Sequence, residues 1–268
     1  MMLNRSLKIL VVSFFLFLQP LLGSYKERLQ HLSLQDKTYL RHFFRKIIYQ
    51  DVGGHVLCFE NKPVCSSGAV LKMQGASPQF KERLVTKGWL TWKRVESLFP
   101  HENFIFCEEP ITVDRPNLKY KYLQILIVNV KATRDCLQKH EHVFKEVLGS
   151  HFSVEDFLDD VREKRELLSL INSDQALLGI LLGFGEESSL IFKEKTRDRL
   201  PAWTDDYQGV GMGWAGRPSM IPVAFIGNPQ SEEVRLLVDA YDREYHELKK
   251  MYWRKDLLKV TLHHLCQR

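Results

Sequence analysis

Residues 123–128 read Leu-Gln-Ile-Leu-Ile-Val, an apolar run rich in β-branched side chains. A short run of this composition predicts a strand buried in the centre of a sheet. Aromatic and β-branched residues also fill 104–107, and we expect the two strands to pair. The stretch between them, from Pro110 to Lys121, is rich in turn-forming residues and predicts the connection between two antiparallel neighbours.

Two further segments predict short strands that extend this sheet. Residues 52–70 place Gly53, Gly54 and Gly68 around short β-prone runs, which is typical of a hairpin. Residues 221–226, Ile-Pro-Val-Ala-Phe-Ile, predict one more strand. We therefore expect a small, mainly antiparallel sheet.

Helical periodicity dominates the remainder of the chain. Ser33 and Asp36 form a capping pattern, after which apolar residues recur at three- and four-residue spacing. The last helix has Asn228 as its predicted cap and Pro229 at its first position. Its apolar stripe consists of Val234, Val238, Tyr241, Tyr245, Leu248 and Tyr252. The predicted helices cover about 33–48, 77–98, 132–148, 153–170, 173–195 (divided by glycines) and 229–265. The expected fold class is α+β, a helix-rich single domain over 24–268 with a small sheet and a long C-terminal helix.

The composition suits a packed domain and excludes two broad classes of protein. The chain has 268 residues, of which 44% are hydrophobic, and this is enough for a sizeable core rather than a disordered tail. The formal net charge is only +5 with 26% charged residues. The chain therefore lacks the large excess of Lys and Arg that is needed to neutralise nucleic-acid phosphates. The composition therefore predicts no nucleic-acid partner.

The N-terminus has the layout of an export signal. Arg5 and Lys8 precede an uncharged, mostly apolar run, Ile9 to Leu22, which Gly23 and then charged residues follow. The run is shorter than the roughly 20 residues that a spanning helix needs. We expect residues 1–23 to be a signal peptide and the protein to be periplasmic or secreted. The alternative is an uncleaved membrane anchor formed by residues 9–22.

The cysteines allow one named disulfide. Five cysteines cannot all pair within one molecule, so at least one stays free or pairs elsewhere. Cys58 and Cys65 flank a turn-like segment and would face each other across the predicted hairpin, which makes them the disulfide candidate. The alternative is that both are buried thiols, since free Cys is among the most buried residue types.

A loop rich in aromatic, acidic and glycine residues is the leading candidate for a binding site. Flat aromatic faces beside carboxylates and flexible glycines suit a sugar, a peptide or another polar ligand. The alternative is a surface loop whose tryptophans plug into the core. The candidate ligand-binding residues are Trp203, Asp205, Asp206, Tyr207, Trp214 and Arg217.

The sequence offers no decisive catalytic, metal or cofactor motif. His140 and His142 lie two apart on a predicted helix, so they should point to different faces and not share a metal ion. Glu108 and Glu109 could supply an acid and a base together with Asp205 or Asp206, although adjacent carboxylates are more often solvated turn residues. We therefore expect no metal and no cofactor.

Two stretches carry a family resemblance. Residues 43–64 contain Phe-Phe-Arg-Lys and then Val-Gly-Gly-His-Val-Leu-Cys-Phe-Glu-Asn-Lys-Pro-Val, and 177–185 contain Leu-Leu-Gly-Ile-Leu-Leu-Gly-Phe-Gly. Both are similar to stretches of uncharacterised exported or envelope-associated proteins of chlamydia-like bacteria. The resemblance implies a bacterial cell-envelope setting and carries no activity.

These observations predict an exported, envelope-associated domain that binds a ligand or another protein. The alternative function is an exported hydrolase that acts on a saccharide or peptide through a carboxylate pair. A retained N-terminal anchor would instead display the domain at a membrane.

Overall fold

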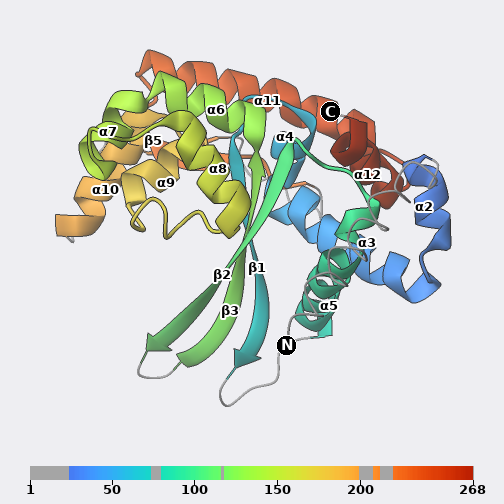
Figure 1. Ribbon diagram of the computed structural model, residues 1–268. Helices are drawn as coiled ribbons and strands as arrows, with labels where there is room; N and C mark the ends of the chain where they lie inside the picture. Colours follow the sequence, from blue (N-terminus) through green and yellow to red (C-terminus); the bar gives the residue numbers. More distant parts are fainter. Residues whose placement is uncertain (1–23, 74–79, 116–117, 199–207, 212–219, 268) are drawn as a thin grey trace, which may run out of the picture.

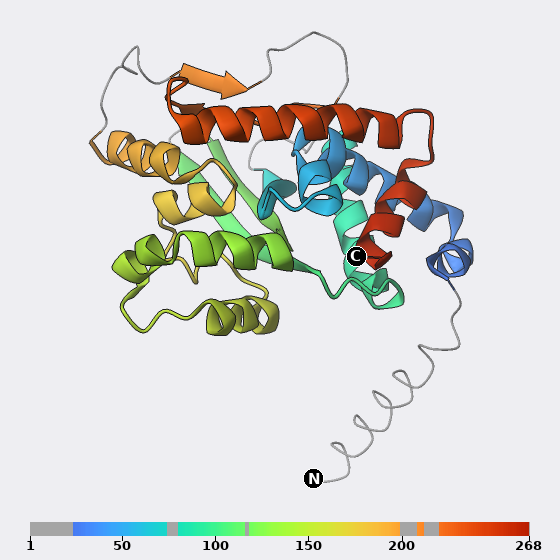
Figure 2. The same ribbon diagram turned by 90° about the horizontal axis from the view of Figure 1, so that it is seen from above.

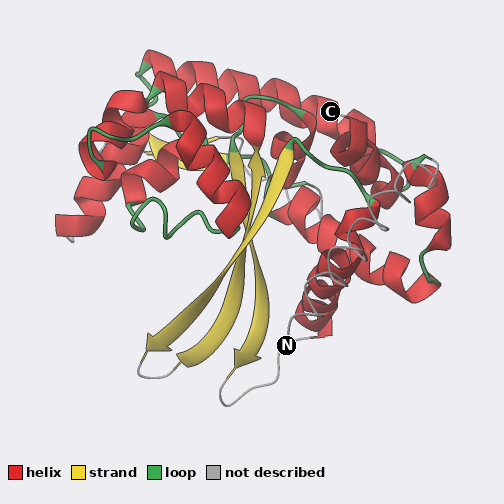
Figure 3. Ribbon diagram, viewed as in Figure 1, coloured by secondary structure: helices red, strands yellow, loops and turns green. Residues whose placement is uncertain are grey.

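The computed structural model describes residues 24–73, 80–115, 118–198, 208–211 and 220–267 and confirms the expected α+β class. Helices flank a small antiparallel sheet, and a long helix lies near the C-terminus (Figures 1 and 3). The elements are α2 (Tyr25–His31), α3 (Leu34–Gln50), α4 (Gly53–Cys58), β1 (Val64–Met73), α5 (Phe80–Val95), the 3₁₀ helix η2 (Glu96–Leu98), β2 (Phe104–Arg115), β3 (Leu118–Asn129), α6 (Val130–Lys139), α7 (Glu141–Leu148), α8 (Val154–Lys164), α9 (Gln175–Leu181), α10 (Glu186–Asp198), β4 (Gln208–Gly211), β5 (Ala224–Gly227), α11 (Glu232–Tyr252) and α12 (Leu257–Gln267).

The apolar run at 123–128 is the middle of the central strand, as predicted. The sheet has the order β1-β3-β2, and β2 pairs with β3 from Phe104↔Asn129 to Arg115↔Leu118. The predicted long connection from Pro110 to Lys121 is wrong, because both strands continue through it. Pro110 is tolerated because β2 is an edge strand, where a missing N–H can face away from the ladder.

The two faces of the sheet support two separate hydrophobic clusters. On one face Phe106, Ile125 and Ile127 pack against α3, α4, α5 and α12. On the other face Leu126 and Val128 pack against the helices from α6 to α9. Burying each such side chain stabilises the fold by about 1.5–3 kcal/mol. The hairpin end of the sheet extends beyond the helices, apart from α5, which accompanies β1 (Figure 1).

The predicted hairpin over residues 52–70 is wrong in its first half, which is the helix α4. The glycines serve close packing rather than a turn: a Cβ on Gly53 would lie 2.3 Å from Cγ2 of Ile47. Val52 enters the helix with a left-handed backbone, φ 53°. The side chain of Asn129 then ties α4 to the sheet, because its Nδ2 donates to the carbonyls of Val56 (2.9 Å) and Phe59 (3.1 Å).

The helix predicted over 132–148 is divided into α6 and α7. His140 stands between them with φ −110° and ψ 21°, outside the helical range, and so it turns the chain. The segment predicted as one helix over 153–170 also ends early, at Lys164, where Arg165 adopts a left-handed conformation with φ 55°. By contrast, Ser33 and Ser153 cap α3 and α8 as predicted.

The C-terminal part departs from prediction in two ways. The predicted final helix is divided after Tyr252 into α11 and α12, and Ser231 precedes it as the cap residue. The strand expected near Ile221 is β5, which pairs only with β4 in a separate two-stranded sheet among the described residues. The predicted stripe of α11 faces inward, and α11 runs along both groups of helices (Figure 2).

Candidate functional site

The leading candidate loop lies outside the part of the chain that the structure describes. This applies to Trp203, Asp205, Asp206, Tyr207, Trp214 and Arg217. Their role as ligand-binding residues therefore stays a prediction. The same holds for any acid–base pair that includes Asp205 or Asp206.

The disulfide candidate is not formed in the structure. Cys58 ends α4 and Cys65 lies on β1, and both are fully buried thiols that are not joined to each other. Burial raises the pKa of the Cys65 thiol to about 12, so it stays protonated in the folded protein. Both cysteines therefore match the alternative prediction of buried thiols.

Glu108 and Glu109 are not solvated turn residues, as the sequence suggested, but neighbours within β2 that point to opposite faces. The carboxylate of Glu108 accepts hydrogen bonds from Trp89 Nε1 (2.7 Å) and from Lys93 Nζ (2.5 Å) on α5. The carboxylate of Glu109 accepts from three successive backbone N–H groups, those of residues 167, 168 and 169, at 2.7, 2.6 and 3.3 Å. Each carboxylate therefore anchors a neighbouring segment, and the two do not form a catalytic pair with each other.

The turn between α9 and α10 collects an unusual set of polar contacts. α9 ends at Leu181, and the carbonyls of the next two residues accept hydrogen bonds from side chains. The buried ammonium of Lys62 donates to the carbonyl of Leu182, and Tyr241 Oη donates to the carbonyl of Gly183 at 2.7 Å. Gly183 has φ 77°, and a Cβ there would lie 2.3 Å from that Oη. A cation at the negative end of the α9 dipole is electrostatically favourable.

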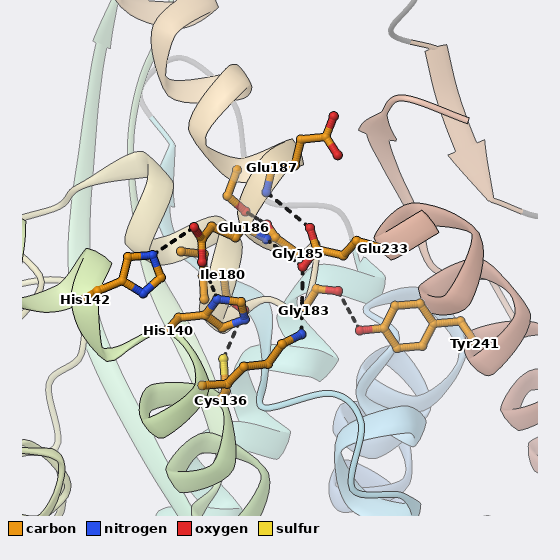
Figure 4. Close-up of polar contacts among 12 residues, drawn as sticks. Cys136, His140, His142, Ile180, Gly183, Gly185, Glu186, Glu187, Glu233 and Tyr241 are labelled. Atoms are coloured by element: carbon orange, nitrogen blue, oxygen red, sulfur yellow. Dashed lines mark hydrogen bonds and ion pairs between the residues drawn. The ribbon is translucent and has the colours of Figure 1, made fainter. Parts of the chain in front are cut away.

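The N-terminus of α10, the positive end of that helix's dipole, binds a carboxylate. The carboxylate of Glu233 on α11 accepts from the backbone N–H groups of Glu186 and Glu187, each at 3.2 Å (Figure 4). These two N–H groups have no acceptor within α10 itself. Charge of the appropriate sign therefore caps both helix ends at this turn.

His140 and His142 converge on one carboxylate, contrary to the prediction that they diverge. Nδ1 of His140 lies 2.6 Å from Glu186 Oε2, and Nε2 of His142 lies 3.1 Å from Oε1 (Figure 4). Convergence is possible because the chain turns at His140 instead of continuing one helix. Burial acts to raise the pKa of Glu186, but the hydrogen bonds from His140 and His142 outweigh it, and the net pKa is lowered.

A second buried cluster joins residues that the sequence did not connect. His55 Nδ1 donates to Glu244 Oε2 at 2.7 Å, and Asn61 Nδ2 donates to Oε1 at 2.6 Å. Burial lowers the pKa of His55 despite the contact with Glu244, so the imidazole is neutral at neutral pH. The separation of 189 residues between His55 and Glu244 leaves no local sequence signal.

This pair resembles the base and the orienting acid of a catalytic triad, but no hydroxyl or thiol of the described residues bonds to the imidazole as a third member. In a triad, the free imidazole nitrogen takes a proton from a hydroxyl or thiol. Nε2 of His55 is buried and has no hydrogen-bond partner. The His55–Glu244 pair joins α4 to α11.

One edge of the main sheet, on β2, is closed over residues 106–110. The N–H of Glu108 donates to the carbonyl of Arg165 (3.2 Å), and Arg165 Nη1 donates to the carbonyl of Phe106 (3.5 Å). In an antiparallel strand both backbone groups of a residue face the same side, so even-numbered residues of β2 face outward. Pro110 is the next outward residue and has no N–H to offer. A foreign strand therefore finds no free template over 106–110.

On the other edge, β1 has no further strand paired with it among the described residues. The N–H of Asn129 donates to the carbonyl of Pro63 (2.8 Å), so odd-numbered residues of β3 face β1. The register Cys65↔Ile127 then directs the backbone of Ser66 and Gly68 outward. Within the described ranges, the outward N–H and C=O groups of these two residues have no backbone partner. The register shift after Val70 ends this regular stretch.

Comparisons of the chain with protein-family models, curated proteins and solved structures found no match. Over the described ranges, no helix is long and apolar enough to cross a membrane. The same ranges contain no cluster of three or more His, Cys, Asp or Glu suited to a metal ion.

Proposed function

We propose that the chain is an exported, envelope-associated protein-interaction domain that captures an extended segment of a partner protein along β1. The observation that carries this proposal is the open edge at Ser66 and Gly68. Their outward N–H and C=O groups form a template on which a peptide can add as a fourth strand. Export rests on the signal-like segment at residues 1–23.

The described titratable groups favour binding over catalysis. Glu108, Glu109, Glu186, Glu233 and Glu244 each accept hydrogen bonds that join elements of the fold. A general acid or base must instead reach a substrate proton. The open edge needs no such group, because backbone hydrogen bonds supply the affinity and flanking side chains supply the specificity.

A proline substitution tests the edge directly. Ser66→Pro removes one outward N–H and leaves the β1–β3 ladder intact, because the N–H of Ser66 does not face β3. Ser66→Ala is the matched control, since it removes only the hydroxyl that accepts from Gln124 Nε2 at 2.6 Å. We expect Ser66→Pro to weaken capture of an envelope protein at least about fivefold, the worth of one lost hydrogen bond.

The measurement is quantitative recovery of a co-purified protein from the native envelope fraction with each variant. A partner that the wild type and Ser66→Ala retain and Ser66→Pro releases supports the proposal. Equal retention by all three variants contradicts it. Intact mass tests export separately: a mature chain that begins at Ser24 is expected, and a full-length chain would contradict signal cleavage.

A further inference from the structure

Exposed cations gather on one corner of the molecule. The corner consists of α2, α3 and the segment 253–267, which includes α12. Among the described residues of these three segments, the exposed carboxylate is Glu27, whereas Asp36 and Asp256 are partly buried. The exposed Lys and Arg residues, which we call the basic corner, are Lys26, Arg41, Arg45, Arg254, Lys255 and Lys259.

Two contacts link the two ends of the described chain at this corner. Arg41 on α3 pairs with Asp256 at 3.1 Å, and Asp256 lies between Lys255 and Lys259 in the sequence. The rings of Tyr25 on α2 and His263 on α12 lie 5.8 Å apart. The segments that carry these cations are therefore close together in space, although α12 is far from α2 and α3 in the sequence.

An exposed tryptophan adjoins the same cations. Trp253 follows α11 and is 69% exposed, although tryptophan is among the most costly side chains to leave in water. The guanidinium of Arg254 lies 5.7 Å from its ring centroid. The ring centroids of Tyr49 on α3 and Tyr252 at the end of α11 lie 6.3 Å apart, so the two helices are in contact here. Tyr49 is one helical turn after Arg45. Exposed Trp beside Lys and Arg is typical of surfaces that bind the bilayer interface.

The sequence before the corner identifies the partner. The apolar run Ile9 to Leu22 ends three residues before Tyr25, the first residue of α2. Three residues span at most about 10 Å of extended chain. Whenever this run lies in a bilayer, during export or as an anchor, α2 and Lys26 are held at the lipid headgroups. Cations at that position are attracted to anionic lipid.

We propose that the basic corner docks on a membrane by binding anionic phospholipid headgroups, with Trp253 at the bilayer interface. The proposal does not rest on the open edge of β1, since no residue of the basic corner belongs to that strand. Docking in this way would orient the domain with α2 and α12 facing the membrane.

The test compares binding of the full chain to two kinds of vesicle, phosphatidylcholine alone and phosphatidylcholine mixed with phosphatidylglycerol. Arg5, Lys8 and other exposed cations also favour the anionic vesicles, so the change in the ratio of the two partition coefficients on substitution, not the ratio itself, reports the corner. We expect a ratio of at least about 100, with about fivefold lost for each cation removed. Arg45→Gln combined with Lys259→Gln should therefore lower the ratio about 25-fold.

The matched control removes two exposed cations from the opposite group of helices, by Lys145→Gln combined with Lys164→Gln. These side chains are 44% and 48% exposed and belong to α7 and α8. We expect the control to leave the ratio within about twofold. A blue shift of tryptophan fluorescence on anionic vesicles, present in the wild type and absent in Trp253→Phe, is also expected.

Three results would overturn the proposal: no preference for anionic vesicles, equal losses in the control and corner variants, or tighter binding to an RNA oligonucleotide than to vesicles at equal phosphate concentration. The last would assign the corner to nucleic acid. Urea midpoints of all variants within error of the wild type exclude unfolding as the cause.

Discussion

Lys62 is a charged group that the folded protein holds at a cost, and the size of this cost can be measured. Its side chain is 1% exposed, and its ammonium donates to the carbonyl of Leu182 and lies over the rings of Phe184 and Tyr241 at 5.1 and 5.7 Å. Burial lowers its pKa from the ordinary 10.5 to about 8, even though nearby Glu244 favours the charged form. Each step of one in pKa is worth about 1.4 kcal/mol, so charge on Lys62 lowers stability by about 3 kcal/mol relative to the neutral amine.

The pH dependence has a definite sign. Between pH 8 and 10.5 the unfolded chain keeps the proton on Lys62 and the folded protein gives it up. The unfolded state then binds more protons, so the free energy of unfolding rises with pH through this window. Relative to Lys62→Met, the wild type should gain about 1 kcal/mol by pH 9 and about 2 to 3 kcal/mol by pH 10. Below pH 8 the difference should be constant.

The assay is urea unfolding at pH 7, 8, 9 and 10 under reducing conditions, read as the difference between the wild type and Lys62→Met. Unfolded thiols and tyrosines titrate in both proteins, so their contributions cancel. Lys131→Met is the control: it also replaces a lysine by methionine, but this side chain is 60% exposed and pairs with Glu60 on the surface. A flat difference for Lys62→Met would show that the ammonium is not held in a desolvated site.

Three further predictions concern the other polar groups. Glu186→Gln should cost about 1 kcal/mol at pH 7 and nothing well below pH 4, because the folded pKa of Glu186 is lowered and its contribution disappears on protonation; acid titration of urea midpoints checks this. Glu109→Gln should cost about 1–3 kcal/mol, because one oxygen cannot serve three N–H groups, and the measurement is hydrogen exchange at residues 167–169. Without reductant, the unfolded chain should take up alkylating agent at all five cysteines, and the folded chain slowly, since burial raises the pKa of Cys266 to about 11 and those of Cys65 and Cys136 to about 12. A mass deficit of two hydrogens would contradict the free thiols.

Features set by neighbouring residues could be predicted from the sequence. The side-chain oxygens of Ser33 and Ser153 accept hydrogen bonds from N–H groups three residues later in the chain. The residues that form each cap are therefore the same neighbours that make up the sequence pattern. The stripe of α11 is equally local, because helical periodicity alone places Val234, Tyr241 and Leu248 on one face. The strand at 123–128 follows from composition in the same way.

Features set by distant residues could not be predicted. Glycines indicate either a turn or a close approach, and only the neighbouring Ile47 shows that Gly53 belongs to a packed helix. The turn at His140 likewise comes with a bond to Glu186, 46 residues away, which no local pattern contains. The candidate site was missed for the same reason: an open edge is a property of strand order, which no local pattern contains.

The two edges of the sheet differ in their hydrogen-bond partners: Arg165 bonds to part of the β2 edge, and no strand pairs with the outer side of β1 in the described ranges. Arg165, which bonds to the β2 edge, also ends α8 with a left-handed backbone, φ 55°, which costs a non-glycine residue about 1–2 kcal/mol. The bonds from Arg165 to Phe106 and Glu108 offset that cost and block strand addition. On β1 the regular register ends after Val70 within the described ranges, so the outward stretch that includes Ser66 and Gly68 is short. A short edge offers few backbone hydrogen bonds, so the affinity for a peptide depends largely on its side-chain contacts. Such an edge therefore favours a specific partner segment over general aggregation.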